Sequence, residues 1–189
     1  MSREEREAVM LREAGAVFAA RGFHAASMDE IAERVGVSKP MVYSYFGSKE
    51  ALYFAYIEDA GRDLVAAMIA AESEVRDQDV ETRLRAGTRA FFRFVADHRD
   101  GYSVLFSEMA AAGGPLRREV TAIRRRIVDL VQYLIADEAL AEAYVGAGEA
   151  LANWWIEHPE PGVEAMTDKL VALAWVGLRE MVSEDTSRG

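Results

Sequence analysis

Residues 27–52 read SMDEIAERVGVSKPMVYSYFGSKEAL. Gly36 and Gly47 divide this stretch into two helical runs of about two turns each, because glycine favours the left-handed conformation that ends a helix. A serine suited to an N-cap precedes each run, and a third opens the next helix: Ser27, Ser38 and Ser48. Ser27 and Glu30 have the spacing of a capping box. The stretch therefore predicts two very short helices joined by a tight turn.

The apolar residues of these two runs have spacings that let them pack with Phe18 of the preceding helix: Ile31, Ala32, Val35, Val37, Val42 and Phe46. Burial of that set leaves a second set outside: Lys39, Pro40, Met41, Tyr43, Ser44 and Tyr45. This is the geometry of a helix-turn-helix, whose second helix enters the major groove of DNA. The alternative is that the tyrosines and the methionine only pack on a neighbouring helix.

The rest of the chain also reads as helix, since helix formers dominate and no alternating β-branched run has the length of a strand. We expect an all-α protein, with a small N-terminal module at about residues 1–50 and a larger helical body at about 51–189. Glycine, proline and cap positions predict helices at about 3–20, 27–36, 38–47, 48–71, 79–98, 102–111, 115–137, 140–157 and 163–182.

Composition narrows the classes of function. The chain has 189 residues, no cysteine and a formal charge of −10. Residues 1–50 hold 7 Lys+Arg and 8 Asp+Glu, so a polyanionic partner would meet this nearly neutral part. The sequence shows no secretory leader and no apolar run of membrane-spanning length, so a cytoplasmic protein without membrane contact is expected.

Residues 27–52 closely resemble the DNA-binding region of TetR/AcrR-type transcriptional regulators, and the likeness extends over about residues 5–58. Val-Gly-Val-Ser at the turn, Tyr-x-Tyr-Phe and Ser-Lys-Glu-x-Leu occur in register. The resemblance implies a homodimer with about nine helices per subunit. It also implies an N-terminal operator-binding domain and a C-terminal domain that binds an effector and dimerises.

The resemblance also implies roles for single residues. Those at groove-facing positions, or where base or phosphate contacts fall, are Lys39, Pro40, Met41, Tyr43, Ser44 and Tyr45. Lys49 matches a lysine that grips phosphate at the start of the fourth helix. Ser27 is expected to cap its helix, with or without a phosphate hydrogen bond. Asp29 would repel the DNA backbone, or only stabilise the start of its helix.

The helical body carries two further predicted surfaces. An apolar effector pocket is expected from Met68, Phe91, Phe94, Tyr102, Phe106, Met109, Tyr133 and Trp154, although aromatic stripes of this kind are more often ordinary core. The last two helices have wide apolar faces that a two-fold four-helix interface would bury. The predicted interface residues are Leu151, Trp155, Leu170, Leu173, Gly177 and Met181.

Signals for an enzyme, a cofactor or a metal are poor. The only phosphate-loop hint, Gly146-Ala147-Gly148, lacks the third glycine and a preceding strand, and the three histidines have no ligand spacing. The basic run at 124–126 is expected to be a solvated helix face. We expect a ligand-responsive repressor that binds a palindromic operator as a homodimer. The alternative is a helical dimeric ligand- or protein-binding module without operator recognition.

Overall fold

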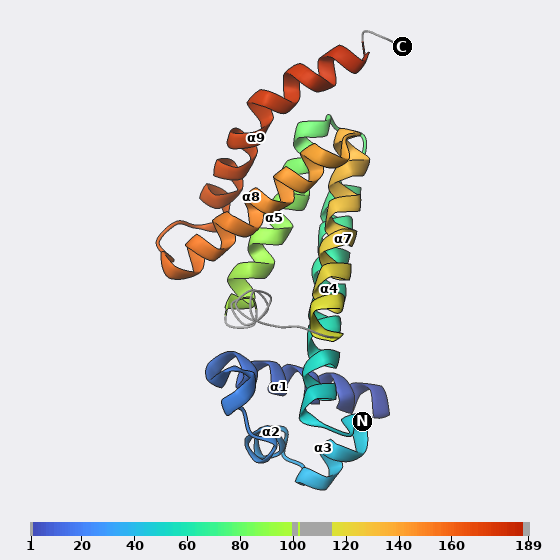
Figure 1. Ribbon diagram of the computed structural model, residues 1–189, viewed down its shortest axis with the longest axis vertical. Helices are drawn as coiled ribbons and strands as arrows, with labels where there is room; N and C mark the ends of the chain where they lie inside the picture. Colours follow the sequence, from blue (N-terminus) through green and yellow to red (C-terminus); the bar gives the residue numbers. More distant parts are fainter. Residues whose placement is uncertain (1, 100–101, 103–114, 187–189) are drawn as a thin grey trace. The chain divides into compact units, whose positions relative to one another are not determined.

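A computed structural model of the chain describes residues 2–99, 102 and 115–186, with only the backbone given for 115–116 and 176–186. These residues form helices without any strand, as predicted (Figure 1). The expected helix at 102–111 lies outside them, except for Tyr102. The helices are α1 (Arg3–Ala25), α2 (Met28–Val35), α3 (Lys39–Phe46), α4 (Lys49–Ser73), α5 (Val80–Asp97), α7 (Pro115–Ile135), α8 (Glu138–Glu157) and α9 (Val163–Thr186).

The backbone separates into two compact units. The first holds residues 1–62 with 98–121, and the second holds 63–97 with 122–189. The first unit therefore contains the whole of the predicted N-terminal module and continues to Arg62 along α4. A functional boundary at residue 50 stays a prediction.

The first unit is built on the apolar stripe of α1. Met10, Ala14, Val17 and Phe18 are all at most 1% exposed, and Leu11 is 7% exposed, so the predicted stripe is confirmed. α1 packs on α2, which packs on α3. Gly15 lets Tyr56 of α4 lie against α1, because a methyl group at this position would collide with the ring of Tyr56. The core is therefore continuous from α1 to the beginning of α4.

Three helix ends differ from expectation: the C-terminal end of α1 and the caps at Ser27 and Ser38. α1 continues to Ala25 through a bend at Gly22, whose φ is 72° and ψ 163°. Its N-cap, Ser2, forms a capping box with Glu5. The capping box predicted at Ser27 is wrong, because Ser27 Oγ accepts from the N–H of Asp29 at 3.1 Å, whereas the Glu30 carboxylate lies 3.5 Å from Arg21.

The other two predicted serine caps, Ser38 and Ser48, differ in whether the side chain forms a hydrogen bond. Ser38 occupies the N-cap position of α3 as predicted, but its side chain makes no capping hydrogen bond. Pro40, near the start of α3, removes one of the backbone donors that such a bond would use. Ser48 caps α4 as predicted, since its Oγ accepts from the N–H of Ala51 at 3.0 Å. α4 therefore begins with a side-chain cap, and α3 begins without one.

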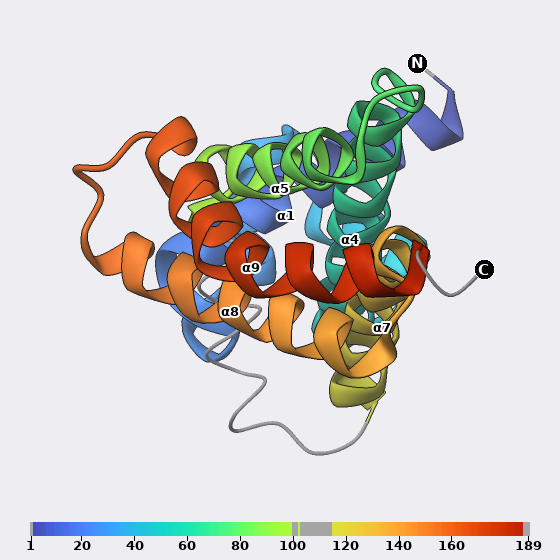
Figure 2. The same ribbon diagram turned by 90° about the horizontal axis from the view of Figure 1, so that it is seen from above.

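The second unit is centred on α5, which packs against α9, while α8 also packs against α9 (Figures 1 and 2). Phe92 and Trp155 are at most 2% exposed, and their rings meet edge to face with centroids 5.8 Å apart. Trp155 Nε1 donates to the carbonyl of Pro161 at 2.7 Å, which satisfies the buried indole in the turn after α8. This contact ties the α8–α9 connection to the core.

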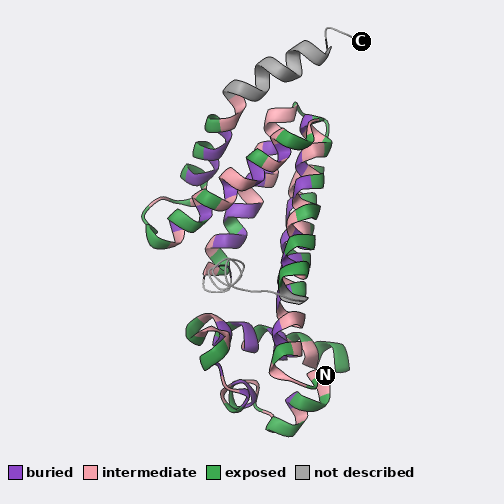
Figure 3. Ribbon diagram, viewed as in Figure 1, coloured by how far each residue is buried: buried purple, intermediate pink, exposed green. Residues whose placement is uncertain are grey.

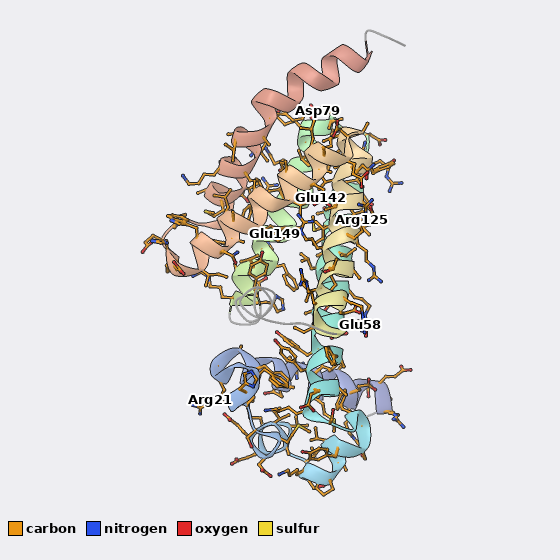
Figure 4. All side chains as sticks on the ribbon, viewed as in Figure 1. Arg21, Glu58, Asp79, Arg125, Glu142 and Glu149 are labelled. Atoms are coloured by element: carbon orange, nitrogen blue, oxygen red, sulfur yellow. The ribbon has the colours of Figure 1, made fainter. Side chains whose placement is uncertain are left out.

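Ion pairs surround the core of the second unit. Arg124 on α7 lies 3.0 Å from Glu149 and also pairs with Glu142. The two glutamates are labelled in Figure 4. Arg125 pairs with Glu138 at 2.7 Å. Two of the three arginines at 124–126 are thus paired with α8, and Arg126 is exposed. The run does not present three free cations to a second polyanion site.

Candidate nucleic-acid interface

A single tight turn sets the direction of α3 relative to α2. Gly36 ends α2 in the left-handed conformation, with φ 76° and ψ 34°. Its N–H donates to the carbonyl of Glu33 at 3.1 Å, and the N–H of Val37 donates to the carbonyl of Ala32 at 3.0 Å. These bonds close the C-terminal end of α2 in the manner of a glycine-terminated helix. The chain is thereby turned within three residues into α3.

α3 has one buried position and a row of exposed residues, as the burial colours of the ribbon show (Figure 3). Val42 is fully buried and fixes the inner side of the helix. The solvent-facing side carries Lys39, Pro40, Tyr43 and Ser44, and Tyr43 is 39% exposed. Met41 and Tyr45 are half-buried beside them. The surface that the sequence predicted is therefore present, while contact of each side chain with DNA stays a prediction.

An ion pair crosses from α2 to the first residue of α3. Lys39 Nζ donates to Asp29 Oδ2 at 2.8 Å, and both side chains remain exposed. The hydrogen bond and the charge of Asp29 raise the pKa of Lys39. Sequence analysis did not predict this pair, because the two residues are ten positions apart on different helices. Asp29 therefore neutralises part of the positive charge that α3 would offer to a phosphate.

The N-terminal end of α1 also reaches α3. The guanidinium of Arg3 lies over the ring of Tyr45, 5.1 Å from its centroid, which is a cation–π distance. On α3 itself, the hydroxyl of Ser44 donates to the carbonyl of Met41 at 2.7 Å. This bond uses the one proton of Ser44, so its oxygen is left to accept, for example from an amino group on a base. This contact places Arg3 beside α3.

Lys49 does not point freely into solvent. Its Nζ donates to the carbonyls of Phe23, His24 and Ala26 at 2.9, 3.2 and 3.1 Å. These residues form the C-terminal end of α1 and the position after it. The predicted phosphate contact of Lys49 stays a prediction, but in this structure the ammonium group has other partners.

The positive charge on this unit is sparse. Of the seven lysines and arginines in residues 1–50, four lie within 4 Å of a carboxylate. The pairs are Arg12–Glu13, Arg21–Glu30, Arg34–Glu13 and Lys39–Asp29. Because few cations are left for phosphates, we expect affinity for DNA to fall only modestly with salt.

The residues predicted to line an effector pocket do not share one environment. Met68, Phe91 and Phe94 are 7 to 8% exposed in the second unit, and Tyr102 is 1% exposed in the first. Tyr133 and Trp154 are 73% and 45% exposed. Tyr133 lies under the guanidinium of Arg83, and Trp154 stacks on His158. Phe106 and Met109 lie outside the described residues, and the pocket as a whole stays a prediction.

The residues predicted to form the dimer interface also differ in how far they are buried within one chain. Trp155 and Leu170 are each 2% exposed within one chain, so they support the protomer's own core. Leu173 is 69% exposed on α9, and Leu151 is half-buried on α8. The side chains of Gly177 and Met181 lie outside the described residues. Among the predicted residues whose side chains are described, Leu173 keeps the most surface available to a second copy.

The second unit contains a buried polar pair, Thr88 and Tyr144, that sequence analysis did not predict. Thr88 Oγ and Tyr144 OH are 2.7 Å apart, and Thr88 also donates to the carbonyl of Leu84 at 2.8 Å. Because Thr88 has one proton and gives it to Leu84, Tyr144 is the donor to Thr88. Burial raises the pKa of Tyr144 to about 12. Thr88 lies three residues before the buried Phe91, on the same face of α5. This helical spacing is the feature of the sequence that indicates a buried hydroxyl at Thr88.

No helix among the described residues has the length and apolar content needed to cross a bilayer. Within the same residues, no group of three or more His, Asp or Glu side chains is placed to hold a metal ion.

A short exposed helix, set by a glycine turn on two supporting helices, defines a helix-turn-helix DNA-binding protein. Residues 10–56 match the profile of bacterial regulatory proteins of the tetR family, and residues 80–177 match that of a tetracyclin repressor-like C-terminal domain. The chain belongs to the TetR family of transcriptional regulators.

Relatives agree with this assignment over most of the chain. The transcriptional activator FasR of Mycolicibacterium smegmatis is 32% identical over 94% of this chain and 85% of its own length. A TetR-like regulator from Rhodococcus sp. RHA1 is 37% identical, with a TM-score of 0.79, and the match covers 95% of this chain and 98% of that one. FadR of Bacillus subtilis, solved with stearoyl-CoA, shares the fold at 17% identity, with a TM-score of 0.77 over 88% and 96% of the two chains.

Proposed function

We propose that this regulator binds a palindromic operator in the cytoplasm as a homodimer, and that a small, largely apolar effector releases it. The observation that carries the proposal is the exposed row on α3, anchored by the fully buried Val42. The alternative, a helical binding module without operator recognition, gives no reason for Lys39, Tyr43 and Ser44 to face solvent together.

The chemistry of the row suits base edges in a major groove about 12 Å wide. Lys39 can donate to guanine O6 and N7, and the Ser44 oxygen can accept from an amino group on a base. The methionine and tyrosine side chains offer apolar contact to thymine methyl groups. In a two-fold dimer the two α3 helices would read half-sites about 34 Å apart, which is one turn of DNA.

A homodimer through α8 and α9 is supported by apolar side chains that one protomer leaves exposed. Leu173 on α9 and Trp154 on α8 are 69% and 45% exposed, and α8 packs directly on α9. A second copy related by a two-fold axis would bury both side chains in one interface. The two-fold axis of the dimer would then match the symmetry of the operator.

The apolar core of the second unit supports an apolar effector. Met68, Phe91 and Phe94 supply buried aromatic and thioether surface there. Because FadR of Bacillus subtilis was solved with stearoyl-CoA, long-chain acyl groups are the first effectors to test. An effector that weakens operator binding must itself be bound less tightly by the operator complex, by the same factor.

The test is selection of genomic fragments by the purified protein, followed by footprinting on those it retains. Tyr43→Ala should weaken binding to the selected fragment by about tenfold or more. Tyr133→Ala removes an exposed tyrosine from the second unit and should leave affinity unchanged in the absence of effector. If no fragment is retained at low salt, the binding-module alternative is favoured. FasR is named an activator, so activation has to be tested beside repression. A reporter gene fused to the bound promoter shows which of the two this protein causes.

A further inference from the structure

The C-terminal end of α1 lacks the partners that a continuing helix would supply. Helices leave their last carbonyls without intrahelical hydrogen bonds, and those groups need donors from elsewhere. α1 bends at Gly22, so only a short last turn, residues 23–25, follows the bend. The N–H of Ala26 returns to the carbonyl of Gly22 at 3.1 Å. The carbonyls of Phe23, His24 and Ala26 then depend on another part of the chain.

Lys49 supplies the donors for all three carbonyls. A lysine ammonium has three N–H groups, and the three bonds of 2.9 to 3.2 Å match that number. The negative end of the α1 dipole also favours a cation at this place. The same ammonium lies 4.7 Å from the centroid of the Phe23 ring, within cation–π distance. The site is thus built for the charge of Lys49.

The position of Lys49 in the chain gives this contact a consequence for α3. Lys49 is the first residue of α4, and only Gly47 and Ser48 separate it from the end of α3. Its carbonyl partners lie 23 to 26 residues earlier. The contact therefore fixes the C-terminal end of α3, the proposed recognition helix, to the C-terminal end of α1. Phe23 extends the attachment into the core, since its ring centroid lies 5.0 Å from that of Tyr53.

We infer that Lys49 is a positioning residue, which holds the C-terminal end of α3 in place by capping α1, and that it does not release these carbonyls to bind phosphate. The inference rests on the proposed operator binding for its effect on DNA. Its structural part is independent of that function, because the contacts exist within one protomer.

The wild-type protein provides the first test, since its sequence contains only three lysines, Lys39, Lys49 and Lys169. Reductive methylation followed by mass spectrometry reports each one separately. Lys169 is exposed and should react quickly, whereas Lys49 should react at least about tenfold more slowly because all three of its N–H groups are hydrogen-bonded. Equal reactivity of Lys49 and Lys169 without DNA would overturn the inference.

Substitution provides the second test, with Lys39→Met as the matched control for Lys49→Met. Lys49→Met should lower the midpoint of thermal unfolding by several degrees, on the order of 3–6 °C. Amide exchange in residues 23–26 should become about tenfold faster. Lys39→Met should change neither. Lys49→Arg, which keeps a cation with several donors, should recover most of the midpoint.

Operator binding at 10 °C distinguishes positioning from phosphate contact. Lys49→Met should lose about tenfold in affinity while the plot of log K against log salt keeps its slope. A lysine that touches phosphate in each subunit would lower that slope by about 0.9 per contact. A lower salt slope for Lys49→Met, or an affinity equal to that of wild type at this temperature, would overturn the inference. If the wild-type protein binds no DNA, the proposed function fails, while methylation and amide exchange still decide whether Lys49 caps α1.

Discussion

Asp29 holds Lys39, the first residue of the recognition helix, in a hydrogen-bonded ion pair of 2.8 Å. Both residues are exposed, so the pair adds little to the stability of the fold. Its effect is on the charge that α3 presents. A lysine that must leave a carboxylate before it meets DNA gains less from a phosphate or a guanine than an unpaired lysine does.

Asp29→Asn should therefore strengthen binding to DNA of any sequence. The change removes one negative charge from the proposed interface and frees Lys39, so we expect affinity to rise by about threefold to tenfold at low salt. Fluorescence anisotropy with a selected and a random duplex measures both affinities. Glu33→Gln removes the same charge from the same helix without breaking this pair, and should have a smaller effect. Weaker binding by Asp29→Asn would mean that the carboxylate aligns Lys39 instead.

Two glycines in different conformations give a matched pair of stability predictions. Gly36 has φ 76°, so Gly36→Ala should lower the free energy of unfolding by about 1–2 kcal/mol. Gly87 lies within α5, where an added methyl group meets no atom within 4 Å. Gly87→Ala should raise the free energy of unfolding by about 0.5–1 kcal/mol, because alanine favours a helix. Urea titrations with unchanged m-values measure both. Equal effects of the two substitutions would contradict the conformational argument.

The Thr88–Tyr144 pair predicts an asymmetry between its two single substitutions. Tyr144→Phe removes the donor but leaves Thr88 bonded to Leu84, so the expected loss is about 0.5–1.5 kcal/mol. Thr88→Val leaves the buried hydroxyl of Tyr144 without its acceptor, and the expected loss is larger, about 1–3 kcal/mol. Denaturant unfolding of both variants and of the double variant measures the coupling. A larger loss from Tyr144→Phe would show that the donor assignment is wrong.

The sequence predicted those features that depend on local spacing. The buried stripe of α1, the two short helices and the exposed row on α3 follow from periodicity of three to four residues and from glycine at helix ends. The spacing Ser-x-x-Glu occurs at Ser2 and again at Ser27, and periodicity cannot tell which serine forms the box. Glu30 is drawn instead toward Arg21, a residue outside the motif.

Contacts between distant positions escaped prediction for a different reason. The carbonyl partners of Lys49 and the pairing of Asp29 with Lys39 depend on how helices cross, which spacing within one helix does not contain. The apolar faces predicted on α8 and α9 divide between the core of the protomer and its surface, which spacing within one helix does not distinguish. Trp155 and Leu170 turn inward to the protomer core, whereas Leu173 remains exposed.

Alkaline pH should destabilise the protein through Tyr144 in particular. Burial raises the pKa of Tyr144 from 10.0 to about 12, partly opposed by Thr88 and Arg85. The unfolded chain therefore loses the phenolic proton first as pH rises. The contribution of Tyr144 is fully present below about pH 10 and is lost between about pH 10 and 12, which corresponds to about 2–3 kcal/mol for a shift of two units.

Comparison of variants isolates this contribution from other groups that titrate in the same range. The free energy of unfolding of wild type should fall more steeply between pH 10 and 12 than that of Tyr144→Phe, which has no proton to lose at this position. Urea titrations at pH 9, 10, 11 and 12 provide the curves. Parallel curves for wild type and Tyr144→Phe would mean that this hydroxyl is hydrated in the folded protein, because only exclusion from water holds its proton to so high a pH.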